Sequence, residues 1–134
     1  LIQDQEKSLL KDIIEKKGLK GFIEIENQVN LKINTEKTVI ATGGSIVYSK
    51  EAMSHFDKTA IIVYIKLDIE NLKNRLGNMK QRGVVLKEGQ DLEGLYKERC
   101  PLYEEYADLI VSGDKKTVEE LLSDIVTMVS PLIK

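Results

Sequence analysis

A pair of glycines follows a short apolar run in the sequence Thr42-Gly43-Gly44-Ser45. If the run is a strand of an open α/β sheet, the pair lies beyond its carboxyl end, where ligands bind in such sheets. Two glycines there let a ligand approach the main chain and offer it bare N–H groups. The alternative is a tight turn that needs glycine for positive φ, and the pair alone favours this alternative.

The arginines form a second group of candidates. Of the 20 basic residues, 17 are lysines and only Arg75, Arg82 and Arg99 are arginines. An arginine presents a planar fork that suits carboxylate or phosphate, and a flat face for stacking. Sparse use therefore suggests that each position needs this geometry, although chance, or a stem packed along a helix, would also explain it.

Two of these arginines lie in informative segments. Arg82 opens a stretch with two glycines, RGVVLKEGQD, and we expect a lid over about residues 81–91. A mobile loop with an arginine can close over a phosphoryl donor and exclude water, whereas the alternative is a plain surface loop. Arg99 stands in ERCPLYEE, where Pro101 is expected to bend or restart a helix.

The surrounding pattern indicates which elements position these residues. Short runs rich in Val and Ile predict buried strands at Thr38–Thr42, Thr59–Leu67 and Asp108–Ser112. Helical patterns separate them, with Ser8, Asp68 and Thr117 as expected N-caps. Alternating strands and helices predict an α/β fold with a parallel sheet and helices on both faces.

Composition narrows the classes of function. The 134 residues suit a single domain, and a net charge of −2 argues against nucleic acid or an anionic membrane as partner. The single cysteine, Cys100, cannot form an internal disulfide, which fits the cytoplasm. With one His and one Cys, we expect no zinc site, and no metal ligand is assigned in this chain. A first residue that is Leu1, inside an apparent helix, suggests a fragment or a processed chain.

Taken together, VIATGGS after a strand, the Arg-led lid and ERCPLYEEYAD resemble the shikimate kinases, in order and spacing, over essentially the whole chain. The resemblance implies a three-layer, P-loop-kinase-like parallel sheet flanked by helices. It also implies transfer of the γ-phosphate of ATP, with Mg²⁺, to the 3-hydroxyl of shikimate.

The resemblance assigns roles to individual residues. On the acceptor side, Arg99 matches the arginine that clamps the substrate carboxylate. The other expected acceptor-side residues are Phe22, Glu26, Gly43, Gly44 and Ser45. On the nucleotide side, Arg82 matches the lid arginine that contacts the transferring phosphate and serves catalysis. Arg75 matches an arginine that stacks near adenine, and Asp114 lies where the adenine-side loop runs.

Three positions depart from the family pattern. Ser45 stands in place of a third glycine, and the lid begins Arg82-Gly83 instead of Arg-Pro. Ile23 occupies the place of a second arginine that binds the shikimate carboxylate. Without this arginine, the site loses charge-assisted hydrogen bonds to the carboxylate, each of which contributes about 1.5–3 kcal/mol. The acceptor could therefore be another hydroxylated small molecule.

The family begins with a strand, a GxxxxGK[ST] loop, a helix and a second strand, a unit that takes roughly 30 residues. The 134 residues contain no such loop, so we expect them to lack the first strand, the P-loop and the second strand, and to be inactive alone. The first strand lies between those that match Thr38–Thr42 and Thr59–Leu67, so a chain that folds without it is expected to self-associate or to be only marginally stable. The competing hypothesis is a non-catalytic remnant that only binds a partner or ligand.

Overall fold

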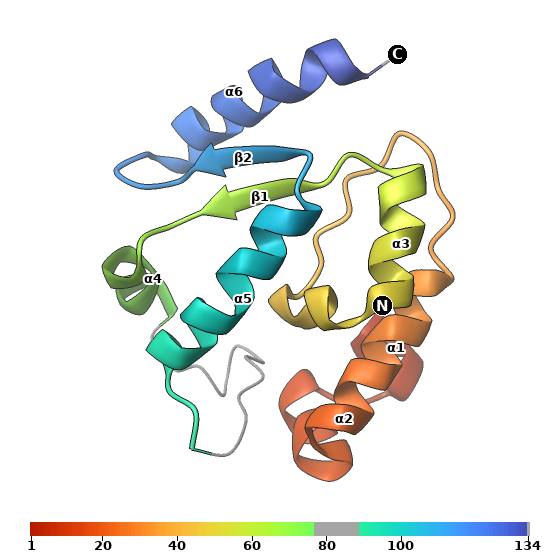
Figure 1. The fold of residues 1–134 in the computed structure, drawn as a ribbon. Helices are drawn as coiled ribbons and strands as arrows, with labels where there is room; N and C mark the ends of the chain where they lie inside the picture. The colour runs from red at the N-terminus through yellow and green to blue at the C-terminus, as the bar shows by residue number, and fades with distance from the viewer. Residues whose placement is uncertain (77–88, 134) are drawn as a thin grey trace. The chain divides into compact units, whose positions relative to one another are not determined.

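The computed structural model describes residues 1–76 and 89–133 (Figure 1). They fall into two compact units, one built mainly from residues 1–55 and the other from residues 56–76 and 92–133. Within the described part of the chain, no helix combines the length and apolar character needed to cross a membrane.

The first unit is helical. It contains α1 (Ile2–Glu6), α2 (Leu10–Leu31), the short 3-10 helix η1 (Gly44–Tyr48) and the beginning of α3 (Lys50–Thr59). Inside α2, Gly18 has φ 70° and ψ −179°, a conformation that favours glycine and that kinks the helix. Ile13 and Phe22, on either side of this kink, form the buried centre of an apolar cluster. The prediction that Ser8 caps α2 was wrong, because the N-cap residue is Leu9 and the Ser8 hydroxyl donates to the Glu6 carbonyl instead.

The second unit contains a parallel pair of strands, β1 (Val63–Lys66) and β2 (Leu109–Ser112). The helices of this unit are α4 (Ile69–Leu76), α5 (Leu92–Tyr106), α6 (Val118–Val129) and the short 3-10 helix η2 (Ser130–Leu132). Helices α5 and α6 lie on opposite sides of the strand pair (Figure 1). The prediction of a parallel sheet flanked by helices is confirmed.

Contacts between β1 and α5 join the strand pair to that helix. The Tyr64 hydroxyl donates to Cys100 Sγ at 3.4 Å, and its ring lies 5.1 Å from the Tyr103 ring, centroid to centroid. Nearby, Lys66 Nζ pairs with Glu104 Oε1 at 2.8 Å. Burial is the largest cause that raises the pKa of Tyr64, and the hydrogen bond to Cys100 raises it further. Cys100 is therefore partly buried and accepts a hydrogen bond from a tyrosine of β1.

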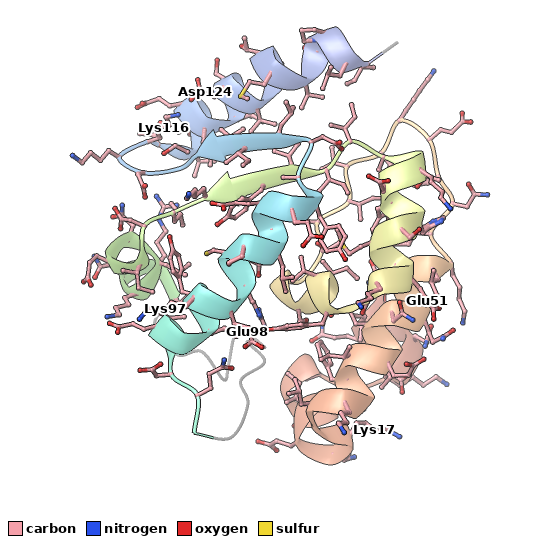
Figure 2. All side chains as sticks on the ribbon, in the orientation of Figure 1. Lys17, Glu51, Lys97, Glu98, Lys116 and Asp124 are labelled. Atoms are coloured by element: carbon pink, nitrogen blue, oxygen red, sulfur yellow. The ribbon has the colours of Figure 1, made fainter. Side chains whose placement is uncertain are left out.

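Both predicted helix caps in this unit are confirmed. Asp68 Oδ1 accepts a hydrogen bond from Asn71 N at 2.8 Å at the start of α4. Thr117 Oγ1 accepts one from Glu120 N at 3.1 Å at the start of α6. Lys116, which directly precedes Thr117, forms an ion pair with Asp124 of α6 (Figure 2). These caps satisfy N–H groups that would otherwise have no partner in the first turn.

The expected strand Thr38–Thr42 is not one: this segment forms no ladder with another described segment, and Val39 is 95% exposed. An extended segment becomes a strand only when a neighbour pairs with its main chain. The hydrogen bond at its start is local, because Thr38 Oγ1 donates to Glu36 O at 2.8 Å. The prediction for Thr59–Leu67 was too long, since Thr59 ends α3 and Ala60 N still donates to Phe56 O.

Candidate functional site

The glycine turn of the first unit closes over a buried carboxylate. Ser45 Oγ donates to Glu26 Oε1 at 2.6 Å, and Asn30 Nδ2 donates to the Glu26 carbonyl at 2.7 Å. Glu26 is 1% exposed and Ser45 is 4% exposed, whereas the main chain of Gly43 and Gly44 lies at the surface. The structure thus brings together three of the predicted acceptor-side residues, Glu26, Gly43 and Ser45.

The Glu26 carboxylate also explains why position 43 is a glycine. Gly43 has φ −68° and ψ 154°, which any residue adopts, so the positive-φ explanation does not apply to it. A Cβ at this position would lie 2.9 Å from Glu26 Oε2, closer than real contacts allow. Glycine is therefore needed here for close approach, and the atom that approaches belongs to the protein itself.

Two asparagines of α2, which the sequence analysis did not single out, support this site. Asn30 holds the Glu26 carbonyl, and Asn27 Oδ1 accepts a hydrogen bond from Ala52 N at 3.2 Å in the first turn of α3. Asn27 therefore caps α3, while the hydroxyl of Ser49, just before that helix, is buried with no hydrogen-bond partner among the described residues. The sequence does contain a signal for them, since two amide side chains lie on a helix face that also carries apolar residues, and buried amides need hydrogen-bond partners.

Phe22 belongs to the apolar core of the first unit. It is 3% exposed and lies with Ile13, and the partly buried side chains Leu19 and Ile25 pack against the two. These contacts fix the helix that carries Glu26 one turn further on. The expected role of Phe22 as a wall of the acceptor site stays a prediction.

A second group of residues meets at the carboxyl ends of β1 and β2. Asp114 Oδ1 accepts hydrogen bonds from Asp68 N at 3.0 Å and from Asn71 Nδ2 at 2.8 Å. Arg75 Nη2 donates to the Gly113 carbonyl at 3.4 Å. The bonds from Asp68 and Asn71, together with the charge of Arg75, lower the pKa of the Asp114 carboxyl. The two predicted nucleotide-side residues Arg75 and Asp114 are therefore neighbours.

The hydrogen bonds of Asp114 and Arg75 indicate what each side chain can do at the carboxyl ends of β1 and β2. Asp114 is an anion that joins the loop after β2 to the start of α4, so its immediate role is structural. Arg75 supplies a planar cation at the carboxyl edge of the sheet, where ligands of such folds bind. Its expected stacking near adenine, and the expected contact of Asp114 with a nucleotide, stay predictions.

The remaining predicted residues lie elsewhere. Arg99 is on α5 and is 7% exposed, and α5 continues through Pro101, so the expected restart of the helix does not occur. Arg82 and most of the expected lid, 81–91, lie outside the described residues. Within residues 1–76 and 89–133, no three His, Cys, Asp or Glu side chains cluster so that they could hold a metal ion.

Comparison with known proteins gives consistent results. The family model described as shikimate kinase matches residues 1–130. A shikimate kinase of Dictyoglomus turgidum is 32% identical over 130 residues, which cover 93% of this chain and 76% of the relative. A shikimate kinase 1 of Pectobacterium atrosepticum is 33% identical over 121 residues, covering 87% of this chain and 69% of the relative.

Solved structures show the same similarity. A shikimate kinase from Acinetobacter baumannii in complex with shikimate superposes with a TM-score of 0.84 at 25% identity, covering 99% of this chain and 76% of that one. A shikimate kinase from Bacteroides thetaiotaomicron gives a TM-score of 0.75 at 21% identity, covering 98% of this chain and 78% of that one. The second likeness concerns the fold alone.

Proposed function

The chain belongs to the shikimate kinase family, and from that membership we propose that it transfers the γ-phosphate of ATP to the 3-hydroxyl of shikimate. The observation that carries the proposal is the TM-score of 0.84, over 99% of this chain, with a kinase whose structure holds shikimate. The family consists of phosphotransferases of the shikimate pathway.

On the acceptor side, we assign the carboxylate of shikimate to Arg99. A guanidinium can hold a carboxylate with two parallel hydrogen bonds, which fixes both the position and the orientation of the acid. As a separate assignment, we propose that the exposed main chain of Gly43 and Gly44 contacts the acceptor, because no side chain projects from it. The buried Glu26 carboxylate lies against the main chain of Gly43.

On the nucleotide side, we propose that Arg75 stacks near adenine, with Asp114 at the same edge, and that Arg82 contacts the transferring phosphoryl group. Positioning and charge stabilisation supply most of the catalysis in phosphoryl transfer, so a cation at the moving phosphate is the decisive contribution. Mg²⁺ would accompany ATP. We assign no residue of this chain to the ion, so none of the roles assigned above passes through it.

One position favours a second acceptor. Ile23 is partly buried next to Phe22, at the place where the family resemblance implies an arginine for the acid group. An apolar side chain there would suit a hydroxylated molecule with a smaller or absent acid group.

We place the reaction in the cytoplasm, where ATP is available, and this location also fits a single unpaired cysteine.

The test is an acceptor screen with the protein as its gene encodes it. ATP is supplied with shikimate or with other hydroxylated acids and neutral polyols, and ADP release and product mass are measured. We expect shikimate to be phosphorylated, and Arg99→Lys to raise its KM roughly tenfold or more because the paired hydrogen bonds are lost.

Lys97→Ala, an exposed position on the same helix, is the matched control and should change neither constant. Phosphorylation of another acceptor in preference to shikimate would support the second acceptor. No phosphorylation of any acceptor would refute both.

A further inference from the structure

We propose that Ser45 is a positioning residue for the acceptor, which acts by holding the buried Glu26 carboxylate under the glycine turn. This inference rests on the proposed function and adds a role that differs from direct substrate contact. The chain of contact runs from Ser45 to Glu26, and from Glu26 to the main chain of Gly43.

The first step is the hydrogen bond itself. Ser45 Oγ and Glu26 Oε1 are 2.6 Å apart, within the range of short bonds between a hydroxyl and an ionised carboxylate. A serine hydroxyl has one proton to donate, and this proton is directed to Glu26. Ser45 therefore has no proton left for a ligand. Its burial, at 4% exposed, also argues against direct contact.

The second step is the orientation of the carboxylate. With Oε1 held by Ser45, Oε2 lies toward Gly43, where an added Cβ would be only 2.9 Å away. The carboxylate is thus held between the serine hydroxyl and the glycine main chain. Any rotation of the Glu26 side chain would change the support under that turn.

The third step leads to the acceptor. Glu26 is 1% exposed and its Oε2 lies against Gly43, so a change in its position reaches a bound acceptor through the glycine turn. Gly43 and Gly44 are exposed and begin η1, whose first bond runs from Ile46 N to the Gly43 carbonyl at 3.3 Å. A fixed Glu26 therefore fixes the exposed main chain that we assign to the acceptor. Such preorganisation lowers the cost of ordering the site on binding.

The experiment compares two buried serines of the same unit in the protein as its gene encodes it. Ser45→Ala removes the bond to Glu26, whereas Ser49→Ala removes a buried hydroxyl with no hydrogen-bond partner among the described residues. Steady-state kinetics give kcat, the KM for shikimate and the KM for ATP. We expect Ser45→Ala to raise the KM for shikimate roughly tenfold, equivalent to about 1.4 kcal/mol, with the KM for ATP unchanged. Ser49→Ala should leave all three constants unchanged.

Each result has a distinct meaning. A wild-type protein that does not phosphorylate shikimate would overturn the proposed function and this role with it. An active wild type, with the same KM for shikimate in Ser45→Ala and Ser49→Ala, would overturn the positioning role alone. A Ser45→Ala variant that raises both KM values equally would also overturn it, because the defect would then be general. If Ser45→Ala does not fold, Ser45→Cys, of similar size but a weaker donor, takes its place under the same criteria.

Discussion

Replacing Gly43 by alanine tests whether the Glu26 carboxylate is what requires a glycine at this position. The backbone at Gly43, φ −68° and ψ 154°, accepts alanine without strain, and this change alone would stabilise the fold by about 0.4–1 kcal/mol through the unfolded chain. The new Cβ, however, would lie 2.9 Å from Glu26 Oε2, inside normal contact distance. Overpacking of this kind costs about 1–3 kcal/mol.

The larger effect decides the sign. Glu26 is buried and held by Ser45, so its carboxylate cannot swing into solvent to relieve the contact. We therefore expect Gly43→Ala to destabilise the protein by roughly 1.3 kcal/mol, the overpacking cost less the gain in the unfolded chain. With a slope of about 2 kcal/mol per molar urea, the unfolding midpoint should fall by roughly 0.7 M.

The decisive measurement repeats this substitution in a Glu26→Ala background, where the opposing carboxylate is absent. There the same change should become neutral or stabilising, which reverses its sign. If Glu26→Ala does not fold, Glu26→Asp, which draws the carboxylate back by one methylene, serves the same purpose. An equal loss of stability in both backgrounds would show that Glu26 is not the group that Gly43 accommodates.

Four further predictions concern stability, activity and assembly. Asn27→Ala should lower the free energy of unfolding by about 1 kcal/mol because Ala52 N loses its cap, whereas Ser49→Ala should change it little; urea unfolding of both variants checks this. The lowered pKa of Asp114 means that the folded state binds its proton less tightly than the unfolded chain. Asp114 should therefore contribute stability at neutral pH that is lost as the pH falls below about 4. The stability difference between wild type and Asp114→Asn should shrink over that range in urea titrations at several pH values, and a difference independent of pH would contradict the assignment. A polypeptide of these 134 residues alone should release no ADP with ATP, Mg²⁺ and shikimate, since it contains no GxxxxGK[ST] sequence; turnover that Arg82→Ala abolishes would require another phosphate site. The same polypeptide should self-associate in light scattering, because β1 has a single partner strand among the described residues, and a sharply unfolding monomer would argue against this.

Features that depend on neighbours in the sequence could be predicted from it. The apolar runs around Val63 and Leu109 become paired strands, and Asp68 and Thr117 cap the helices that follow them. In each case the signal lies within a few residues, because caps and buried runs are set by local chemistry. The family motifs were likewise readable, since they are contiguous strings of residues.

Features that depend on distant partners were decided only by the tertiary structure. The Thr38–Thr42 run has the composition of a strand, yet a strand exists only with a neighbour, and composition does not report one. The bond between Ser45 and Glu26 joins residues 19 apart, and the bond between Asp68 and Asp114 joins residues 46 apart. Nothing local distinguishes a glycine that approaches a ligand from one that makes room for a carboxylate. For Gly43, the fold makes that distinction by bringing α2 against the turn.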